Sequence, residues 1–186
     1  MRVRPKVTRF IEPIGKGLAA IGMTPAAMTV LGLVVVITGA VVIANDRLVL
    51  GAWIVLGGSL LDGLDGAVAR ASNSVSARGA FLDSAFDRLG EIAAFAGLGV
   101  AMAGEARLLL LIILAVGGAI LVPFMRARAE ADGLEGKGGI MGRAERIILF
   151  SAGLIFAQVE PMLWIFVVLV WLTAVQRFVH TYRSFE

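Results

Sequence analysis

The sequence predicts an all-α integral membrane protein with six transmembrane helices, preceded by an N-terminal amphipathic helix on the membrane surface. Hydrophobic residues make up 59% of the 186 residues, whereas soluble domains contain about 45–50%. Uncharged runs extend from Gly17 to Asn45 and from Leu108 to Met125, and about twenty apolar residues span a bilayer as a helix. We expect one domain over residues 1–186, with a juxtamembrane segment at 1–22 and a six-helix bundle at 23–186.

The N-terminal segment combines basic residues with a helical pattern of apolar ones. Apolar residues at positions 7, 10, 11, 14 and 18 follow helical spacing. The basic residues on the other side are Arg2, Arg4, Lys6, Arg9 and Lys16. We expect this helix to lie on the membrane surface, with a disordered basic tail as the alternative. Thr24 and Pro25 are typical of an N-cap and a first helical residue, and they begin the first span, at about 25–44.

The second span is expected to include charged residues, because its uncharged stretch is too short to cross a bilayer. It begins near Leu48, but Asp62 ends its uncharged stretch after only fourteen residues. Continued to Arg70 it reaches about 33 Å, which is enough to cross a bilayer. A polar loop precedes the next span, and a glycine-rich polar loop lies at 129–142. The remaining spans are expected at about 79–103, 107–128, 143–159 and 161–182.

The distribution of basic residues predicts the orientation. Of the seventeen Lys and Arg residues, only Arg47 and Arg107 lie at one end of the predicted bundle. Basic residues are enriched in cytoplasmic loops, so we expect a multi-pass protein of the cell membrane with both termini on the cytoplasmic side. A cleaved signal peptide is not expected, because further apolar runs follow the first one.

Four aspartates lie on these apolar segments: Asp62, Asp65, Asp83 and Asp87. Their i, i+3 and i, i+4 spacing places each pair on one helix face. Spans two and three carry their charges next to the short loop between them, so an antiparallel hairpin brings all four to a similar depth, on the cytoplasmic side. Clustered carboxylates repel one another, and oxygen-rich sites suit Mg²⁺, Mn²⁺ or Ca²⁺. Two such metals can clamp a phosphate during its displacement.

The rest of the sequence limits the kinds of metal site and function that the aspartates can have. The chain has no cysteine and one histidine, which excludes Cys-ligated metals and a His-based metal cluster. Ion-coupled transport also places aspartates in membranes, so a cation-coupled transporter is one alternative. A structural network with Arg70, Arg78 and Arg88 is another.

The spacing of these residues resembles the signature of the CDP-alcohol phosphotransferase family. The pattern is D-x-x-D-G-x-x-A-R, eight further residues, then G-x-x-x-D-x-x-x-D. Every fixed position matches, at Asp62, Asp65, Gly66, Ala69, Arg70, Gly79, Asp83 and Asp87. The resemblance implies two Mg²⁺ ions, with Mn²⁺ as a substitute, a CDP-linked lipid donor and release of CMP. It also implies that the four aspartates bind metal, and that Asp87 deprotonates the acceptor hydroxyl.

The same resemblance implies a binding site for the cytidine diphosphate of the donor. Its members in this chain are Ala26, Ala27, Met28, Thr29, Gly66, Arg70 and Ser76. Many family members have Asn or Asp where Ala26 stands, so only backbone contacts are left at that position.

The second half of the chain resembles the phosphatidylinositol phosphate synthases of this family. The resemblance covers residues 126–130, the glycine-rich loop and residues 143–148, and it implies inositol 1-phosphate as the acceptor. A phosphorylated acceptor requires cations, ideally arginines that bind it through two hydrogen bonds. The candidates are Arg126, Arg143, Arg146 and Arg177. For each of them, the bias of basic residues toward the cytoplasmic side is the alternative explanation.

These observations together predict an enzyme that transfers a phosphatidyl group from CDP-diacylglycerol to inositol 1-phosphate. The products are CMP and phosphatidylinositol phosphate. Alternatives within the family are a glycerol 3-phosphate acceptor and an archaeal CDP-ether lipid donor. The resemblance suggests a homodimer in the lipid bilayer, and the twenty-three glycines would allow close helix packing. No nucleic-acid partner is expected.

Overall fold

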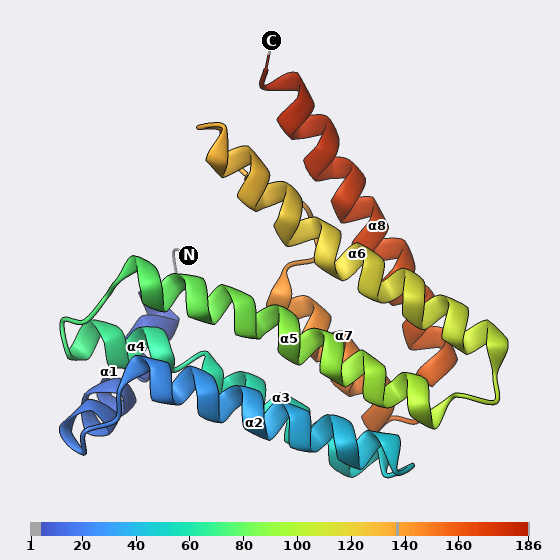
Figure 1. Cartoon of the computed structure of the whole chain (residues 1–186), viewed down its shortest axis with the longest axis horizontal. Helices are drawn as coiled ribbons and strands as arrows, with labels where there is room; N and C mark the ends of the chain where they lie inside the picture. Colours follow the sequence, from blue (N-terminus) through green and yellow to red (C-terminus); the bar gives the residue numbers. More distant parts are fainter. Residues whose placement is uncertain (1–4, 137, 186) are drawn as a thin grey trace.

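The computed structural model describes residues 5–136 and 138–185, and these residues form eight α-helices (Figure 1). The helices are α1 (Pro5–Ala20), α2 (Pro25–Ala44), α3 (Leu48–Asp62), α4 (Asp65–Ala71), α5 (Ala77–Ala101), α6 (Ala106–Ala131), α7 (Arg143–Ile155) and α8 (Val159–Arg183). The predicted all-α class is confirmed. A helix is present in the expected N-terminal segment, whereas Arg2 and Arg4 lie outside the described residues.

Four segments are long and apolar enough to cross a membrane. They are α2, α6, α8 and the 24 residues Leu48–Ala71, which include α3 and α4. Large apolar side chains, among them Trp53 and Ile113, point away from the protein interior. Apolar helices with exposed apolar faces are typical of proteins that pack against lipid.

The predicted fifth span, 143–159, is longer than the helix that the structure contains. Helix α7 has 13 residues, about 20 Å at 1.5 Å per residue. It ends because Ala157 adopts a left-handed backbone conformation with φ of 54°. The N–H of Gln158 donates to the carbonyl of Gly153 at 2.7 Å, which closes the helix in the manner of a C-terminal capping turn. Helix α8 then begins at Val159.

The start of α2 follows the capping prediction. The hydroxyl of Thr24 accepts a hydrogen bond from the N–H of Ala27 at 3.2 Å, and Pro25 is the first helical residue. The side chain thus satisfies one of the free N–H groups at the helix start. This cap fixes where α2 begins, next to the segment that carries the aspartates.

The predicted continuous helix from Leu48 to Arg70 is interrupted at Gly63 and Leu64. The N–H of Leu64 donates to the carbonyl of Leu61 at 3.1 Å, and the N–H of Ala67 to that of Leu64 at 3.0 Å. These tight turns replace the regular i to i−4 pattern for about one turn. As a result, Asp62 ends α3 and Asp65 begins α4, so the two carboxylates do not share one uninterrupted helix face.

Helix α2 is the central partner of α3 and α5, which make few direct contacts with each other. Glycines allow the close packing of α2 on α3. A Cβ atom at Gly39 would lie 3.0 Å from the carbonyl oxygen of Gly51, and one at Gly58 would lie 2.9 Å from that of Gly32. The expected α3–α5 hairpin therefore brings its charged halves together largely through α2, which packs against both helices.

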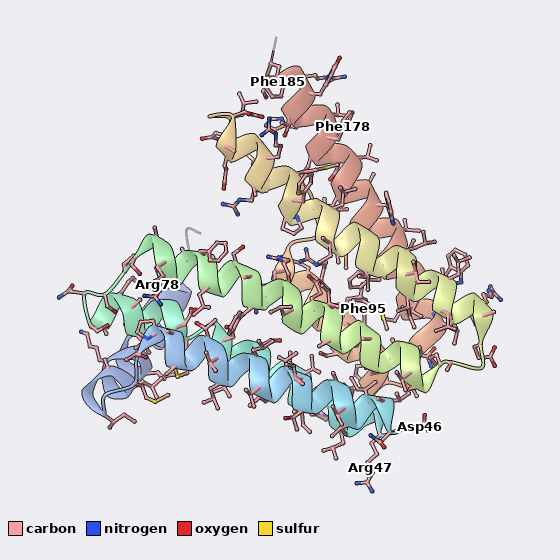
Figure 2. All side chains as sticks on the ribbon, in the orientation of Figure 1. Asp46, Arg47, Arg78, Phe95, Phe178 and Phe185 are labelled. Carbon is pink, nitrogen blue, oxygen red and sulfur yellow. The ribbon has the colours of Figure 1, made fainter. Side chains whose placement is uncertain are left out.

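Aromatic side chains join α5, α7 and α8 in the core. The ring of Phe95 packs edge-on against Phe150 and Phe166, with centroids 4.8 Å and 5.0 Å away, a favourable aromatic geometry. The charged loops lie at the ends of the helices. Asp46 and Arg47 lie at one end of the α2–α3 pair, and Arg78 lies at the opposite end of this region (Figure 2).

Candidate active site

Three of the four predicted aspartates form a cluster between α3 and α5. Oxygen atoms of Asp62, Asp83 and Asp87 lie within 4.8 Å of one another. Asp62 is 4% exposed, and its Oδ1 atom is buried without a hydrogen-bond partner among the described residues. Buried polar atoms nearly always have a partner. An unpartnered carboxylate oxygen beside two further carboxylates therefore fits a divalent cation, for which oxygen is the preferred ligand.

Asp65 lies outside this three-residue group and contacts α2 instead. Its Oδ2 atom accepts a hydrogen bond from the hydroxyl of Thr29 at 2.9 Å. Thr29 is 2% exposed. The structure thus connects a predicted metal ligand with a predicted donor-binding residue at the edge of the acidic cluster.

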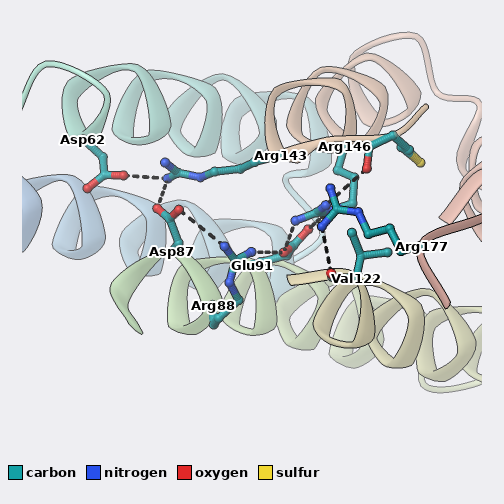
Figure 3. A network of polar contacts seen from close by, with 9 residues as sticks. Asp62, Asp87, Arg88, Glu91, Val122, Arg143, Arg146 and Arg177 are labelled. Carbon is teal, nitrogen blue, oxygen red and sulfur yellow. Dashed lines mark hydrogen bonds and ion pairs between the residues drawn. The ribbon is translucent and has the colours of Figure 1, made fainter. Parts of the chain in front are cut away.

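Arg143, predicted to bind the acceptor phosphate, lies at the aspartate cluster (Figure 3). Its Nη2 atom donates to Oδ2 of Asp62 at 2.6 Å and lies 2.6 Å from Oδ1 of Asp87. Arg143 is the first residue of α7, so a single guanidinium nitrogen links α7 to both α3 and α5. A charge-assisted contact of this length is among the stronger interactions in proteins.

Arg146 forms a buried ion pair with Glu91, a residue that the sequence did not single out. Its Nε and Nη2 atoms donate to the two carboxylate oxygens of Glu91 at 2.5 Å and 3.0 Å, and Arg146 is 2% exposed. Arg88 extends the network, with nitrogens 3.4 Å from Glu91 and 3.6 Å from Asp87 (Figure 3). The sequence spacing could have indicated Glu91 as a site residue, because Asp83, Asp87 and Glu91 follow one another every four residues on α5.

The other two predicted acceptor arginines have different surroundings. Arg177 donates from Nε to the carbonyl of Gly138 at 2.9 Å and from Nη1 to that of Val122 at 2.8 Å. It thereby holds the glycine-rich loop against α6 and α8. Arg126 forms an exposed pair with Glu130 at 2.8 Å. The structure therefore brings Arg143 and Arg146 to the acidic face, and it uses Arg177 to position the loop that precedes them.

The predicted donor-binding residues lie in the first turn of α2, on α4 and at the N-cap of α5. Ala26 and Ala27 are exposed in the first turn of α2, whereas Met28 and Thr29 are buried. A Cβ atom at Gly66 would lie 3.3 Å from Nη1 of Arg70. The hydroxyl of Ser76 caps α5 by accepting the N–H of Gly79 at 3.1 Å. The start of α2, α4 and the start of α5 thus lie next to the aspartates, and nucleotide contacts there remain a prediction.

Gly32 fixes the distance between α2 and Asp62. A Cβ atom at Gly32 would lie 2.7 Å from Cβ and 3.0 Å from Cα of Asp62. We expect Gly32→Ala to push the two helices apart and to weaken Mn²⁺ binding by about tenfold, since overpacking costs about 1–3 kcal/mol. Gly57→Ala on α3 is the matched control, because a Cβ atom there meets nothing within 4 Å. Equal Mn²⁺ affinities for the two variants in an electron paramagnetic resonance titration would contradict this role of Gly32.

Fold and site together define a helical membrane protein in which clustered carboxylates meet Arg143 and the buried Arg146. Residues 22–179 match the model of the CDP-alcohol phosphatidyltransferase family, and the chain belongs to this family. It is thus a membrane transferase of phospholipid biosynthesis. The metal-binding character predicted from the aspartates agrees with this membership and with the geometry of the cluster.

Relatives with named activities are similar to this chain over most of its length. The archaetidylinositol phosphate synthase of Pyrococcus horikoshii is 34% identical over 100% of this chain and 97% of that protein. The Mycobacterium tuberculosis phosphatidylinositol phosphate synthase, solved with CDP-DAG bound, has a TM-score of 0.86 and 32% identity, covering 94% of both chains. The same enzyme in complex with manganese and citrate has a TM-score of 0.85 and 32% identity, covering 92% of this chain and 88% of that one.

Proposed function

We propose that this enzyme transfers a phosphatidyl group from CDP-diacylglycerol to inositol 1-phosphate, releasing CMP and forming phosphatidylinositol phosphate. The observation that carries this proposal is the proximity of Arg143 and Arg146 to the acidic cluster, with Arg143 in direct contact with Asp62 and Asp87. An acceptor without a phosphate group would need only the aspartate cluster and no fixed cations. A phosphorylated acceptor also needs fixed cations beside the reacting hydroxyl.

The donor half of the site is proposed to be formed by the aspartates and the residues around α4. Asp62, Asp65, Asp83 and Asp87 would hold two Mg²⁺ or Mn²⁺ ions. When bound, these ions offset negative charge on the diphosphate of the donor. The manganese complex of the mycobacterial structure supports a divalent cation here. The cytidine diphosphate would contact residues 26–29, Gly66, Arg70 and Ser76. The similar mycobacterial enzyme was solved with CDP-DAG bound, which supports a CDP-linked lipid as the donor.

Asp87 is the proposed base for the acceptor hydroxyl. Its side chain is 9% exposed and lies where the acidic cluster meets Arg143 and Arg88. As it takes the proton, the acceptor oxygen forms a bond to the lipid-attached phosphorus, and the bond from that phosphorus to the CMP oxygen breaks. The phosphate of inositol 1-phosphate would be bound by Arg143 and Arg146, with Arg126 and Arg177 as the outer members of the predicted set.

An archaeal CDP-ether lipid is the second candidate donor. The P. horikoshii protein, named for an archaetidyl product, matches this chain over its full length. Both named activities end in an inositol phosphate lipid, so the relatives favour the same acceptor and leave two donor classes. The aspartate cluster would act on the diphosphate, which both donors share.

The proposed topology has six membrane spans and a cytoplasmic active site. Helices α5 and α7 would complete the bundle with the four apolar segments, and α1 would lie on the membrane surface. Arg107, one of the two basic residues predicted on the far side, pairs with Glu160 at 2.9 Å, and Arg47 lies at the end of α2–α3 away from Arg78 (Figure 2). Exposed apolar faces on the long helices would serve both lipid contact and a homodimer.

An assay of CMP release tests the donor and the acceptor. Purified protein in lipid nanodiscs is incubated with Mn²⁺, one CDP-lipid and one acceptor at a time. We expect inositol 1-phosphate to support the fastest CMP release, with glycerol 3-phosphate and free inositol far slower. Faster release with glycerol 3-phosphate would overturn the acceptor. Comparison of diacyl and ether CDP-lipids at equal concentration decides between the two donors.

A further inference from the structure

The guanidinium of Arg143 contacts the same carboxylates that are suited to a metal. Its Nη2 atom is 2.6 Å from Oδ2 of Asp62 and 2.6 Å from Oδ1 of Asp87. These two aspartates are also members of the group of three whose oxygens lie within 4.8 Å of one another. A Mg²⁺ ion holds its oxygen ligands at about 2.0–2.1 Å. A guanidinium nitrogen and a metal cannot both occupy the space between these two carboxylates.

Arg143 lies where its side chain can move away without breaking a helix. It is the first residue of α7, and Gly142 before it has an extended backbone. The preceding loop contains Gly138 and Gly139, both with positive φ, a conformation that glycine adopts freely. The side chain of Arg143 is 27% exposed, whereas those of Asp62 and Asp87 are 6% and 9% exposed. The cation can thus reach solvent, and the carboxylates stay buried.

We propose that Arg143 is an exchangeable counter-cation of the acidic cluster. A divalent metal that binds Asp62 and Asp87 displaces the guanidinium, which then becomes free to bind the phosphate of the acceptor. This inference rests on the proposed function for the identity of the anion that Arg143 meets next. It assigns Arg143 a role in the order of binding, with metal entry preceding acceptor capture.

In this exchange one cation replaces another, so the buried carboxylates keep a positive charge beside them. Buried carboxylates without a nearby cation are strongly unfavourable, and removing one partner of a buried ion pair leaves an uncompensated charge. Arg143 supplies that compensation, while Arg88 contacts Asp87 from the other side at 3.6 Å. Metal affinity must then include the free energy of displacing Arg143. If one molecule in ten has the guanidinium withdrawn, the apparent dissociation constant is about tenfold weaker than the intrinsic one.

Mn²⁺ binding to the full-length protein in nanodiscs, measured by electron paramagnetic resonance, tests the exchange without any turnover. We expect Arg143→Gln to tighten Mn²⁺ binding by about tenfold, because the competing cation is gone. Arg88→Gln is the matched control, since it removes the same charge beside Asp87 from a nitrogen at 3.6 Å instead of 2.6 Å. Its effect should be clearly smaller than that of Arg143→Gln, because Arg88 contacts Asp87 alone and does not lie between Asp62 and Asp87.

A melting experiment measures a second effect of Arg143→Gln, which is lower stability when no metal is bound. In EDTA, Arg143→Gln should melt at a lower temperature than the unaltered protein, because its carboxylates lack their counter-cation. Saturating Mn²⁺ should then raise its melting temperature by more than it raises that of the unaltered protein. If Arg143→Gln does not fold, Arg143→Lys is used instead. We expect Arg143→Lys also to tighten Mn²⁺ binding, but by a smaller factor.

The outcomes separate this inference from the proposed function. Equal or weaker Mn²⁺ binding by Arg143→Gln, with binding by the unaltered protein intact, overturns the exchange and leaves the metal site standing. Equal tightening by Arg88→Gln also overturns it, since charge alone would then explain the effect. No Mn²⁺ binding by the unaltered protein would instead contradict the metal site of the proposed function.

Discussion

Asp87→Asn is expected to abolish CMP release, with a loss of at least about a thousandfold in kcat. The asparagine has the same shape but cannot accept the proton of the acceptor hydroxyl, and general-base catalysis is worth about 10²–10⁴ in rate. It also removes one of the three carboxylates that lie within 4.8 Å of one another. Both effects act on the transfer step, so no increase in acceptor concentration should restore turnover.

Two comparisons make the result for Asp87 interpretable. Asp132→Asn is the matched control, because Asp132 pairs with the exposed Arg128 at 3.1 Å, at the end of α6, and should leave CMP release unchanged. Mn²⁺ titration of Asp87→Asn then separates its two roles. Lost turnover with Mn²⁺ binding retained assigns Asp87 chiefly as the base, whereas loss of both assigns it as a metal ligand. Near-full CMP release by Asp87→Asn would remove it from the mechanism.

The helices and the acidic cluster were predictable because they depend on local patterns. The cap at Thr24 and Pro25 marks the start of α2, and uncharged runs mark the membrane segments. Spacings of three and four residues, with a short loop between spans two and three, were enough to bring Asp62 near Asp83 and Asp87. Such features need only helix geometry and the length of the apolar runs.

The contacts of the arginines were not predictable, because they connect residues far apart in the chain. Arg143 meets Asp62 across 81 positions, and Arg146 meets Glu91 across 55. Which carboxylate each arginine contacts depends on how α7 packs against α3 and α5. The sequence indicated cations near the site, and both positive-inside topology and phosphate binding explained them. The structure shows a further role for Arg143 and Arg146, which neutralise acidic side chains within the bundle. From the sequence, this role was considered only for Arg70, Arg78 and Arg88.

The break at Gly63 was missed for a related reason. Run length required a segment from Leu48 to Arg70 to cross the membrane, and the chain covers that range with two helices, α3 and α4, separated by Gly63 and Leu64. A tight turn between Asp62 and Asp65 changes the direction of the carboxylates without changing the length of the segment. Run length is insensitive to such a turn, so the separate contacts of Asp65 with Thr29 could be seen only in three dimensions.

The pair of Glu91 and Arg146 is expected to be worth far more to stability than any exposed pair in this chain. Arg146 is 2% exposed, and its pairing with Glu91 has two hydrogen bonds. Glu91→Gln alone leaves the buried charge of Arg146 unpaired, which costs about 3–5 kcal/mol. Arg146→Gln should cost less than this, because Arg88 stays 3.4 Å from Glu91. The double variant leaves two neutral amides, so its free energy of unfolding should be closer to that of the unaltered protein than the sum of the single losses predicts.

The exposed pair of Arg126 and Glu130 is the matched control for this cycle. It has the same residue types, joined at 2.8 Å within α6, and exposed pairs are typically worth about 0.2–1 kcal/mol. Unfolding in detergent, followed by tryptophan fluorescence, gives the coupling free energy of both pairs. A coupling between Glu91 and Arg146 no larger than that between Arg126 and Glu130 would contradict a structural role for the buried pair.

The same variants decide whether Arg146 also binds the acceptor. The sequence predicts that Arg146→Ala mainly raises the KM for inositol 1-phosphate, but loss of folded protein would lower activity as well. In the double variant of Glu91 and Arg146, stability is largely restored while the guanidinium stays absent. A KM that remains about tenfold or more above that of the unaltered protein, as the loss of a charge-assisted hydrogen bond to phosphate predicts, assigns Arg146 to the acceptor phosphate. A normal KM in the folded double variant assigns it to holding α5 and α7 together.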